Sequence, residues 1–173
     1  MTARNTAIVV MGVSGCGKST VGLRLARKLA RDFLEGDTFH PPANVEKMSR
    51  GVPLDDADRL PWLKAIAAAI DSARRSGRQV VVTCSALKRA YRAVLADGHD
   101  DVAFVFLKGG KDLIAQRLAA RAGHFMPPKL LDSQFAALEE PAGDEPSVML
   151  AIEDTPDQIV AAIAASFALG ARG

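Results

Sequence analysis

The residues best suited to chemistry stand near the N-terminus, in the segment 12–19. This segment reads Gly-Val-Ser-Gly-Cys-Gly-Lys-Ser and fits the phosphate-loop pattern G-x-x-x-x-G-K-[ST] without a mismatch. Its glycines let backbone N–H groups turn inward toward phosphate oxygens, and a helix that follows adds its positive N-terminal end. In this pattern the lysine reaches the β- and γ-phosphates, and the last serine is a ligand of Mg²⁺. The predicted ATP-binding residues are Gly12, Val13, Ser14, Gly15, Cys16, Gly17, Lys18, Ser19 and Thr20, with Ser19 on the metal.

The surroundings of this segment decide between a phosphate loop and a glycine-rich turn that matches by chance. An apolar run, Ala7–Met11, precedes it, and an amphipathic stretch, Val21–Ala30, follows it. Strand, loop and helix in that order are the context that the motif requires. The Asn-Lys-x-Asp and Asp-x-x-Gly segments of guanine-specific GTPases do not occur in the sequence. The motif therefore predicts a nucleotide-binding protein that is not such a GTPase.

The rest of the chain alternates apolar runs with amphipathic stretches, which predicts a doubly wound parallel α/β sheet. We expect one domain, residues 1–173, with a P-loop NTPase fold and a five-stranded parallel sheet flanked by helices. The expected strands are 7–11, 32–34, 80–83, 102–107 and 147–152. The expected helices are 21–30, 41–50, 58–76, 88–96, 112–122, 130–138 and 156–169, with Asp58 and Thr155 as N-caps and Gly77 as a stop.

Composition narrows the classes of function. The 173 residues carry 22 basic and 20 acidic side chains, and a net charge of +2 gives no basic footprint for nucleic acid. No run of residues is long enough to span a membrane, and two cysteines make no disulfide framework. We therefore expect a cytoplasmic protein without nucleic-acid or membrane partners.

Carboxylates for the metal and the acceptor have one obvious source. The expected strand 80–83 ends in Cys84-Ser85, where many P-loop proteins have an acidic residue. The segment Glu35-Gly36-Asp37 follows another expected strand, at the edge where ligands gather in open α/β sheets. We assign Glu35 to Mg²⁺ together with Ser19.

Three further blocks resemble the gluconate kinase family, which is related to shikimate kinase and the adenylate-type kinases. They are FLEGDTFHPPANVEKMSRGVPLDDADRLPWL at 33–63, CSALKRAYR at 84–92 and RLAARAGHF at 117–125. The resemblance extends from the phosphate loop to about Met149. It departs from the family at Glu35, where aspartate is more usual, and at 126–128. The resemblance implies an enzyme that transfers the γ-phosphate of ATP to D-gluconate, with another small hydroxy acid or a non-catalytic regulatory role as alternatives.

The resemblance also implies roles on the acceptor side. Asp37 would orient the acceptor hydroxyl or take its proton, although it could instead cap a loop or bind Mg²⁺ through water. His40 either forms a hydrogen bond with the substrate or is structural. Arg59 is the leading candidate for the substrate carboxylate, because its planar fork matches that group; the alternative is a surface ion pair with Asp55 or Asp56. Trp62 is expected in the core.

Two more groups of residues complete the predicted site. After the expected strand 80–83, Ser85 would face the cleft, while Lys88 and Arg92 share a helix face that binds substrate or is solvated. By analogy, Arg121 is assigned to the γ-phosphate and Arg117 to the base or the α- and β-phosphates, and His124 to the substrate. The alternative for Arg121 and Arg117 is that both are exposed arginines on a helix surface. We expect an acceptor-binding insert at about 40–77, a lid at about 121–135, and a homodimer.

Overall fold

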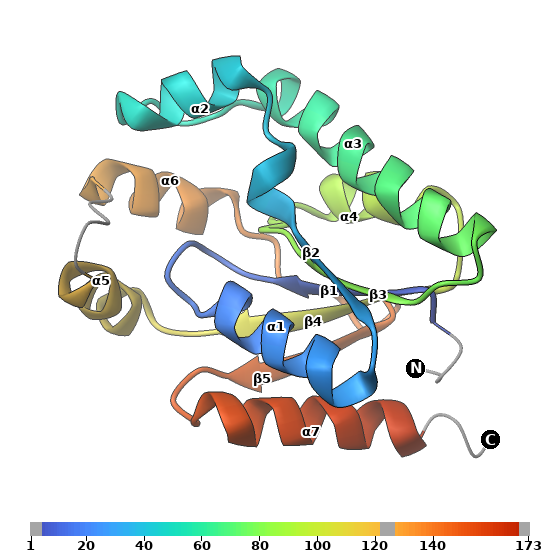
Figure 1. The fold of residues 1–173 in the computed structure, drawn as a ribbon. Coiled ribbons are helices and arrows are strands. Elements are labelled where there is room, and N and C mark those ends of the chain that lie inside the picture. The colour runs from blue at the N-terminus through green and yellow to red at the C-terminus, as the bar shows by residue number, and fades with distance from the viewer. Residues whose placement is uncertain (1–4, 122–126, 170–173) are drawn as a thin grey trace.

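A five-stranded, fully parallel sheet forms the centre of the protein (Figure 1). The computed structural model describes residues 5–121 and 127–169. The strand order is β2-β3-β1-β4-β5, so the strand before the phosphate loop lies in the middle. The strands are β1 (Ala7–Met11), β2 (Asp32–Glu35), β3 (Val80–Thr83), β4 (Val102–Lys108) and β5 (Ser147–Ala151).

Helices cover both faces of this sheet. In Figure 1, α1 and α7 lie below the sheet, whereas α3 and α4 lie above it, and α2 continues outward from α3. The described helices are α1 (Lys18–Leu29), the short 3-10 helix η1 (Gly36–Phe39), α2 (Pro42–Ser49), α3 (Asp56–Arg75), α4 (Arg89–Ala96), α5 (Lys111–Ala120), α6 (Pro128–Ala137) and α7 (Pro156–Leu169).

The alternation of side chains along β1 divides the core into two halves. All five of its side chains are buried. Ile8 and Val10 join the apolar cluster that includes α1 and α7, while Val9 and Met11 join the cluster that includes α3 and α4. A strand buried on both faces must be apolar at every position, which is why this run shows no polar alternation.

The expected elements are confirmed, with small shifts at their ends. The start of α3 is the clearest correction, because Asp55 and not Asp58 is its N-cap. The Asp55 carboxylate accepts a hydrogen bond from the Asp58 N–H (2.7 Å), and the Asp58 carboxylate accepts one from the Asp55 N–H (3.1 Å). This reciprocal capping box satisfies two N–H groups and places the N-cap three residues earlier, so that α3 begins at Asp56, two residues before the expected start. Thr155 caps α7 as predicted, and its Oγ1 accepts a hydrogen bond from the Gln158 N–H.

The parallel arrangement brings three groups of predicted site residues to one edge of the sheet. The phosphate loop, the acidic segment and Ser85 follow the carboxyl ends of β1, β2 and β3, which are neighbours in the sheet. Across the described ranges, 5–121 and 127–169, no helix combines the length and apolar character needed to cross a membrane.

Candidate active site

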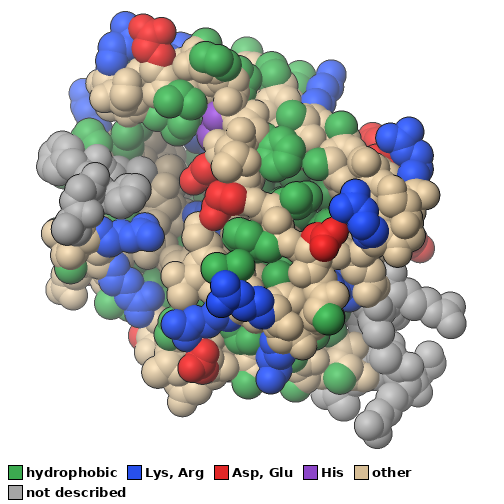
Figure 2. All heavy atoms as spheres, viewed as in Figure 1, with side chains coloured by type: hydrophobic (Ala, Val, Ile, Leu, Met, Phe, Trp, Pro, Cys, Tyr) green, Lys and Arg blue, Asp and Glu red, His purple; other side chains and the backbone are tan. Residues whose placement is uncertain are grey.

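A cavity of about 260 Å³ opens at this edge, between the phosphate loop and the helices α2, α3 and α6. Figure 2 shows acidic side chains gathered beside a hollow that lies below α2. The polar lining combines cations, an anion and hydrogen-bonding groups, as recognition of a small polar molecule requires. Its residues are Ser14, Lys18, Asp37, His40, Met48, Pro53, Leu54, Arg59, Trp62, Ser85, Leu130, Ser133 and Gln134.

The phosphate loop has the backbone that its sequence predicts. Gly17, the N-cap of α1, has φ 97°, a left-handed conformation that glycine adopts without steric cost. The Lys18 ammonium donates hydrogen bonds to the carbonyls of Gly12 (3.0 Å) and Val13 (3.1 Å). Lys18 therefore lies over its own loop, where a nucleotide phosphate would meet it.

The acidic segment is fixed to the end of β3 by close backbone packing. A Cβ at Gly36 would lie 1.8 Å from the Thr83 carbonyl oxygen, so only glycine fits there. The Gly36 N–H donates to Thr83 Oγ1 (3.0 Å), and the Trp62 indole donates to the Gly36 carbonyl (2.8 Å). Thr83 Oγ1 in turn donates to the Glu35 carboxylate. These bonds fix the peptide that immediately precedes Asp37.

The residue after β3 does not supply a metal ligand. Cys84 is buried, and burial raises the pKa of its thiol to about 12. The thiol is therefore neutral at ordinary pH, and a neutral thiol is neither a nucleophile nor a ligand. The candidate acidic groups beside the phosphate loop are therefore the carboxylates of the acidic segment, Glu35 and Asp37.

Arg59 is a buried cation without a carboxylate in ion-pair contact in the described part of the chain. It is only 9% exposed. Its Nε donates to the Leu54 carbonyl (3.3 Å), and its guanidinium carbon lies 5.6 Å from the centre of the Tyr91 ring. In the described part of the chain it forms no ion pair with Asp55, Asp56 or another carboxylate. The alternative of a surface ion pair is therefore wrong.

His40 lies against Trp62 at the wall of the cavity. The two rings are stacked, with their centroids 4.1 Å apart and an interplanar angle of 15°. Burial lowers the pKa of His40; the Asp37 carboxylate opposes this shift, and the Arg59 guanidinium adds to it. Trp62 is 2% exposed, as expected for a core residue, yet it also lines the cavity.

Lys88 and Arg92 are not among the residues that line this cavity. Lys88 forms an ion pair with Asp56 (2.9 Å) at the surface. Arg92 is 2% exposed, so its side chain is not solvated. Its guanidinium forms two hydrogen bonds to the Glu145 carboxylate and donates to the carbonyls of Ala86 and Glu139. The structure thus gives Arg92 an architectural position.

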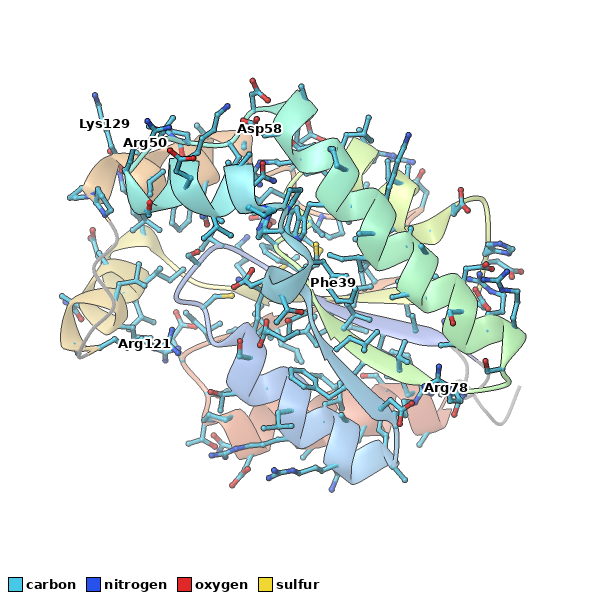
Figure 3. The ribbon with its side chains drawn as sticks, turned by 45° about the horizontal axis from the view of Figure 1, so that its top comes forward. Phe39, Arg50, Asp58, Arg78, Arg121 and Lys129 are labelled. Carbon is cyan, nitrogen blue, oxygen red and sulfur yellow. The ribbon has the colours of Figure 1, made fainter. Side chains whose placement is uncertain are left out.

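The two arginines assigned to the nucleotide phosphates lie apart from the cavity wall, although Leu130, Ser133 and Gln134 of the predicted lid line it. Arg117 donates a hydrogen bond to the Ile152 carbonyl (2.6 Å), next to the end of β5. Arg121 is exposed at the end of α5, away from α2 and α3 (Figure 3). Neither is among the described residues that line the cavity. His124 lies outside the described residues, as does part of the predicted lid.

Known proteins match this chain over most of its length. The family model described as "AAA domain" matches residues 8–141. A gluconokinase from Gluconobacter oxydans is 49% identical over 153 residues, which is 88% of this chain and 86% of the relative. The chain belongs to the gluconokinase family. The thermoresistant gluconokinase of Escherichia coli is 45% identical, over 86% of this chain and 85% of that one.

A solved structure agrees with the family assignment. The crystal structure of a gluconokinase from Sinorhizobium meliloti 1021 has a TM-score of 0.88 and 45% identity to this chain. The likeness covers 98% of this chain and 95% of that one. The P-loop α/β fold and the resemblance seen in the sequence are therefore both confirmed, and the gluconokinase fold extends over nearly the whole chain.

Two residues of this gluconokinase-family cavity were missed by the sequence interpretation. Gln134, on α6, accepts a hydrogen bond from the Ser14 N–H (2.7 Å), and its amide nitrogen lies 3.2 Å from Ser14 Oγ. Ser133 lines the cavity beside it. These contacts link α6 directly to the phosphate loop. Both residues lie within the predicted lid at about 121–135, but no individual role was assigned to either of them.

Removal of the buried Arg92–Glu145 ion pair should destabilise the protein, whereas removal of an exposed ion pair should not. Arg92→Leu would leave Glu145, whose side chain is 9% exposed, without its partner. We expect the free energy of unfolding to fall by about 3–5 kcal/mol, measured by urea denaturation. Arg89→Leu is the matched control. Arg89 lies on the same helix as Arg92, and the variant breaks its exposed ion pair with Asp144. A comparable loss in both variants would contradict the architectural role.

Proposed function

We propose that this protein transfers the γ-phosphate of ATP to a hydroxyl of D-gluconate, giving 6-phospho-D-gluconate and ADP. One observation carries the choice of acceptor: a buried arginine faces a cavity beside the phosphate loop and has no carboxylate partner in the described residues. Membership of the gluconokinase family supports the same choice.

Arg59 would bind the gluconate carboxylate. A buried guanidinium that has no carboxylate in ion-pair contact carries a desolvation cost that an incoming carboxylate offsets. Its five N–H donors form a planar fork that matches a carboxylate with two parallel hydrogen bonds. Only Nε has a protein hydrogen-bond acceptor, the Leu54 carbonyl, among the described contacts of Arg59. The terminal nitrogens therefore remain for the substrate.

Asp37 and Lys18 would bracket the reaction itself. Both line the cavity, with Asp37 on the acceptor side and Lys18 on the phosphate loop. Phosphoryl transfer has a loose transition state, so the main tasks are to align the hydroxyl and to neutralise charge on the transferred group. Asp37 would orient the hydroxyl and accept its proton, while Lys18 would stabilise charge on the phosphate. Ser85 would hydrogen-bond a substrate hydroxyl.

Ser19 and Glu35 are the proposed residues for Mg²⁺. Both offer oxygen donors, which Mg²⁺ prefers, and Mg²⁺ in phosphoryl-transfer sites takes few protein ligands because phosphates and waters fill the rest. Within residues 5–121 and 127–169, no three His, Cys, Asp or Glu residues form a metal-binding group. The donor set thus fits an ion held largely by the nucleotide. The bound ion would neutralise charge on the β- and γ-phosphates.

The lid assignments stay proposals. Arg121 would contact the γ-phosphate after a movement of the segment about 121–135. Arg117 would lie closer to the base or the α- and β-phosphates, and His124 would contact the substrate. The insert at about 40–77 would carry the acceptor. Cytoplasmic location is proposed from the composition, and a homodimeric state from the family resemblance.

A panel of acceptors tests the proposed reaction. ADP release would be measured with ATP and Mg²⁺ in the presence of gluconate, glucose, shikimate or no acceptor. Of these four conditions, we expect fast turnover only in the presence of gluconate. Turnover with shikimate and not gluconate would identify another small-acid kinase. ADP release that no acceptor stimulates would contradict the proposal.

Arg59→Lys tests how the carboxylate is recognised. A point charge cannot replace a two-pronged donor, so kcat/KM for gluconate should fall by about 2–3 kcal/mol, roughly 30- to 160-fold. ATP binding measured without gluconate should stay close to that of the wild type.

The control for Arg59→Lys is Lys64→Arg, a change between the same two residue types at an exposed position of α3. It should leave gluconate kinetics unchanged. If Arg59→Lys is equally silent while Lys88→Ala raises KM for gluconate strongly, the carboxylate binds on the side of α4, and the proposed orientation of the substrate is reversed.

A further inference from the structure

Asn44 is a buried polar residue that the proposed reaction does not use. It lies on α2 and is 3% exposed. Its amide nitrogen donates a hydrogen bond to the Asp58 carbonyl (2.8 Å) and lies 3.3 Å from Nδ1 of His40. The side chain thus joins α2 to the start of α3 and to the histidine at the cavity wall. Figure 3 shows Asp58 at the start of α3, beside α2.

The Asp58 carbonyl fixes which way the Asn44 amide points. A backbone carbonyl only accepts hydrogen bonds, so the Asn44 atom that lies 2.8 Å from it must be the NH₂ nitrogen. The same nitrogen faces His40 Nδ1 and can only donate to it. His40 Nδ1 must therefore be the acceptor, without a proton.

An unprotonated Nδ1 determines the state of the whole ring. A neutral imidazole that accepts at Nδ1 carries its proton on Nε2. Burial of His40 and the nearby Arg59 guanidinium both favour this neutral form, although Asp37 favours the charged one. Stacking on Trp62 fixes the plane of the ring. Nε2–H is then the ring's remaining polar group, on a residue that lines the cavity.

We propose that Asn44 is a positioning residue that holds His40 as an Nε2–H donor toward a hydroxyl oxygen of the acceptor. The cavity then offers a fixed donor at His40 and a fixed acceptor at Asp37, a pattern that suits a polyhydroxy acid. This inference rests on the proposed function for the identity of the acceptor. The state of the ring, however, can be measured without any ligand.

The first test reads the tautomer in the unliganded protein. Long-range ¹H–¹⁵N spectra of ¹⁵N-labelled protein distinguish the two ring nitrogens, and loss of one signal set in His40→Gln assigns them. We expect His40 to be neutral at pH 7 with its proton on Nε2. A proton on Nδ1 of the wild-type ring would overturn the inference, whichever acceptor the protein phosphorylates.

The second test is Asn44→Asp, which reverses the hydrogen bond. An aspartate can only accept from Nδ1–H, and its charge raises the pKa of His40. Above that raised pKa the neutral ring carries its proton on Nδ1 and Nε2 has no donor. Below it the imidazolium regains Nε2–H. KM for gluconate should therefore rise with pH in Asn44→Asp, by roughly tenfold across the titration, but not in the wild type.

Two control variants separate this effect from a loosened insert. Asp37 from η1 and Arg59 from α3 face the His40 ring in the wild type and in Asn44→Asp alike. Their charges therefore do not cause a difference between the two proteins. Lys47→Met removes the ion pair with Asp58 (2.7 Å), which joins α2 and α3 without touching His40. It should leave KM for gluconate independent of pH. The double variant His40→Gln, Asn44→Asp should also lose the pH dependence. The same pH dependence in either control would refute the role of His40.

Discussion

Lys18→Ala should abolish nearly all turnover while the protein stays folded. In the proposed reaction Lys18 supplies positive charge to the transferring phosphate, and loss of such a preorganised group costs roughly 10³-fold in kcat. It contributes nothing to the apolar core, and its described contacts are hydrogen bonds to the carbonyls of Gly12 and Val13 in its own loop. The measurement is kcat for gluconate phosphorylation, with the urea midpoint as the check on folding.

The control for this prediction lies on the same helix. Lys28 is exposed near the end of α1, far along the chain from the phosphate loop. Lys28→Ala should retain normal kcat and normal stability. Near-normal turnover in Lys18→Ala would contradict the assignment of residues 12–19 as a functional phosphate loop.

The features that the sequence predicted well are those with a local cause. A buried parallel strand requires a continuous apolar run, and Ala7–Met11 has one. The phosphate loop depends on glycines at fixed spacing, and its geometry follows from them. The edge at which the acidic segment lies follows from the direction of parallel strands. These inferences need no knowledge of distant contacts.

The predictions that failed concern residues whose contact partners lie far away in the chain. Arg92 looked like a substrate or surface residue because nothing near it reveals Glu145, which lies 53 positions later. Gln134 reaches Ser14 across 120 positions, and only the packing of α6 against the phosphate loop shows this. By contrast, Asn44 and His40 are four residues apart. Their contact is local, but His40 precedes α2, so helical spacing does not predict it.

The close packing around Asp37 fixes the backbone next to the proposed catalytic group. Gly36 is packed against Thr83 so tightly that no side chain fits, and its carbonyl accepts a hydrogen bond from Trp62. The backbone before Asp37 is thus tied both to β3 and to α3. A carboxylate on a backbone tied at two points loses less entropy when it aligns a hydroxyl, which is the main protein contribution to phosphoryl transfer.

Asp37→Asn keeps the size of this side chain and removes its charge. We expect kcat for gluconate to fall roughly 10²-fold or more, the scale of a positioned acid–base group, with the affinity for ATP little changed. The matched control is Asp32→Asn at the start of β2, which removes the charge of an exposed carboxylate paired with Arg78 (2.9 Å). That variant should keep normal kinetics.

The comparison of kcat with ATP affinity separates the two roles open to Asp37. If it orients the acceptor hydroxyl, the loss appears in kcat with gluconate, and binding of ATP and Mg²⁺ without acceptor is unaffected. If it holds Mg²⁺ through water, ATP affinity in the presence of Mg²⁺ falls by a similar factor. Equal losses in both measurements would therefore move Asp37 from the acceptor side of the cavity to the metal site beside Glu35.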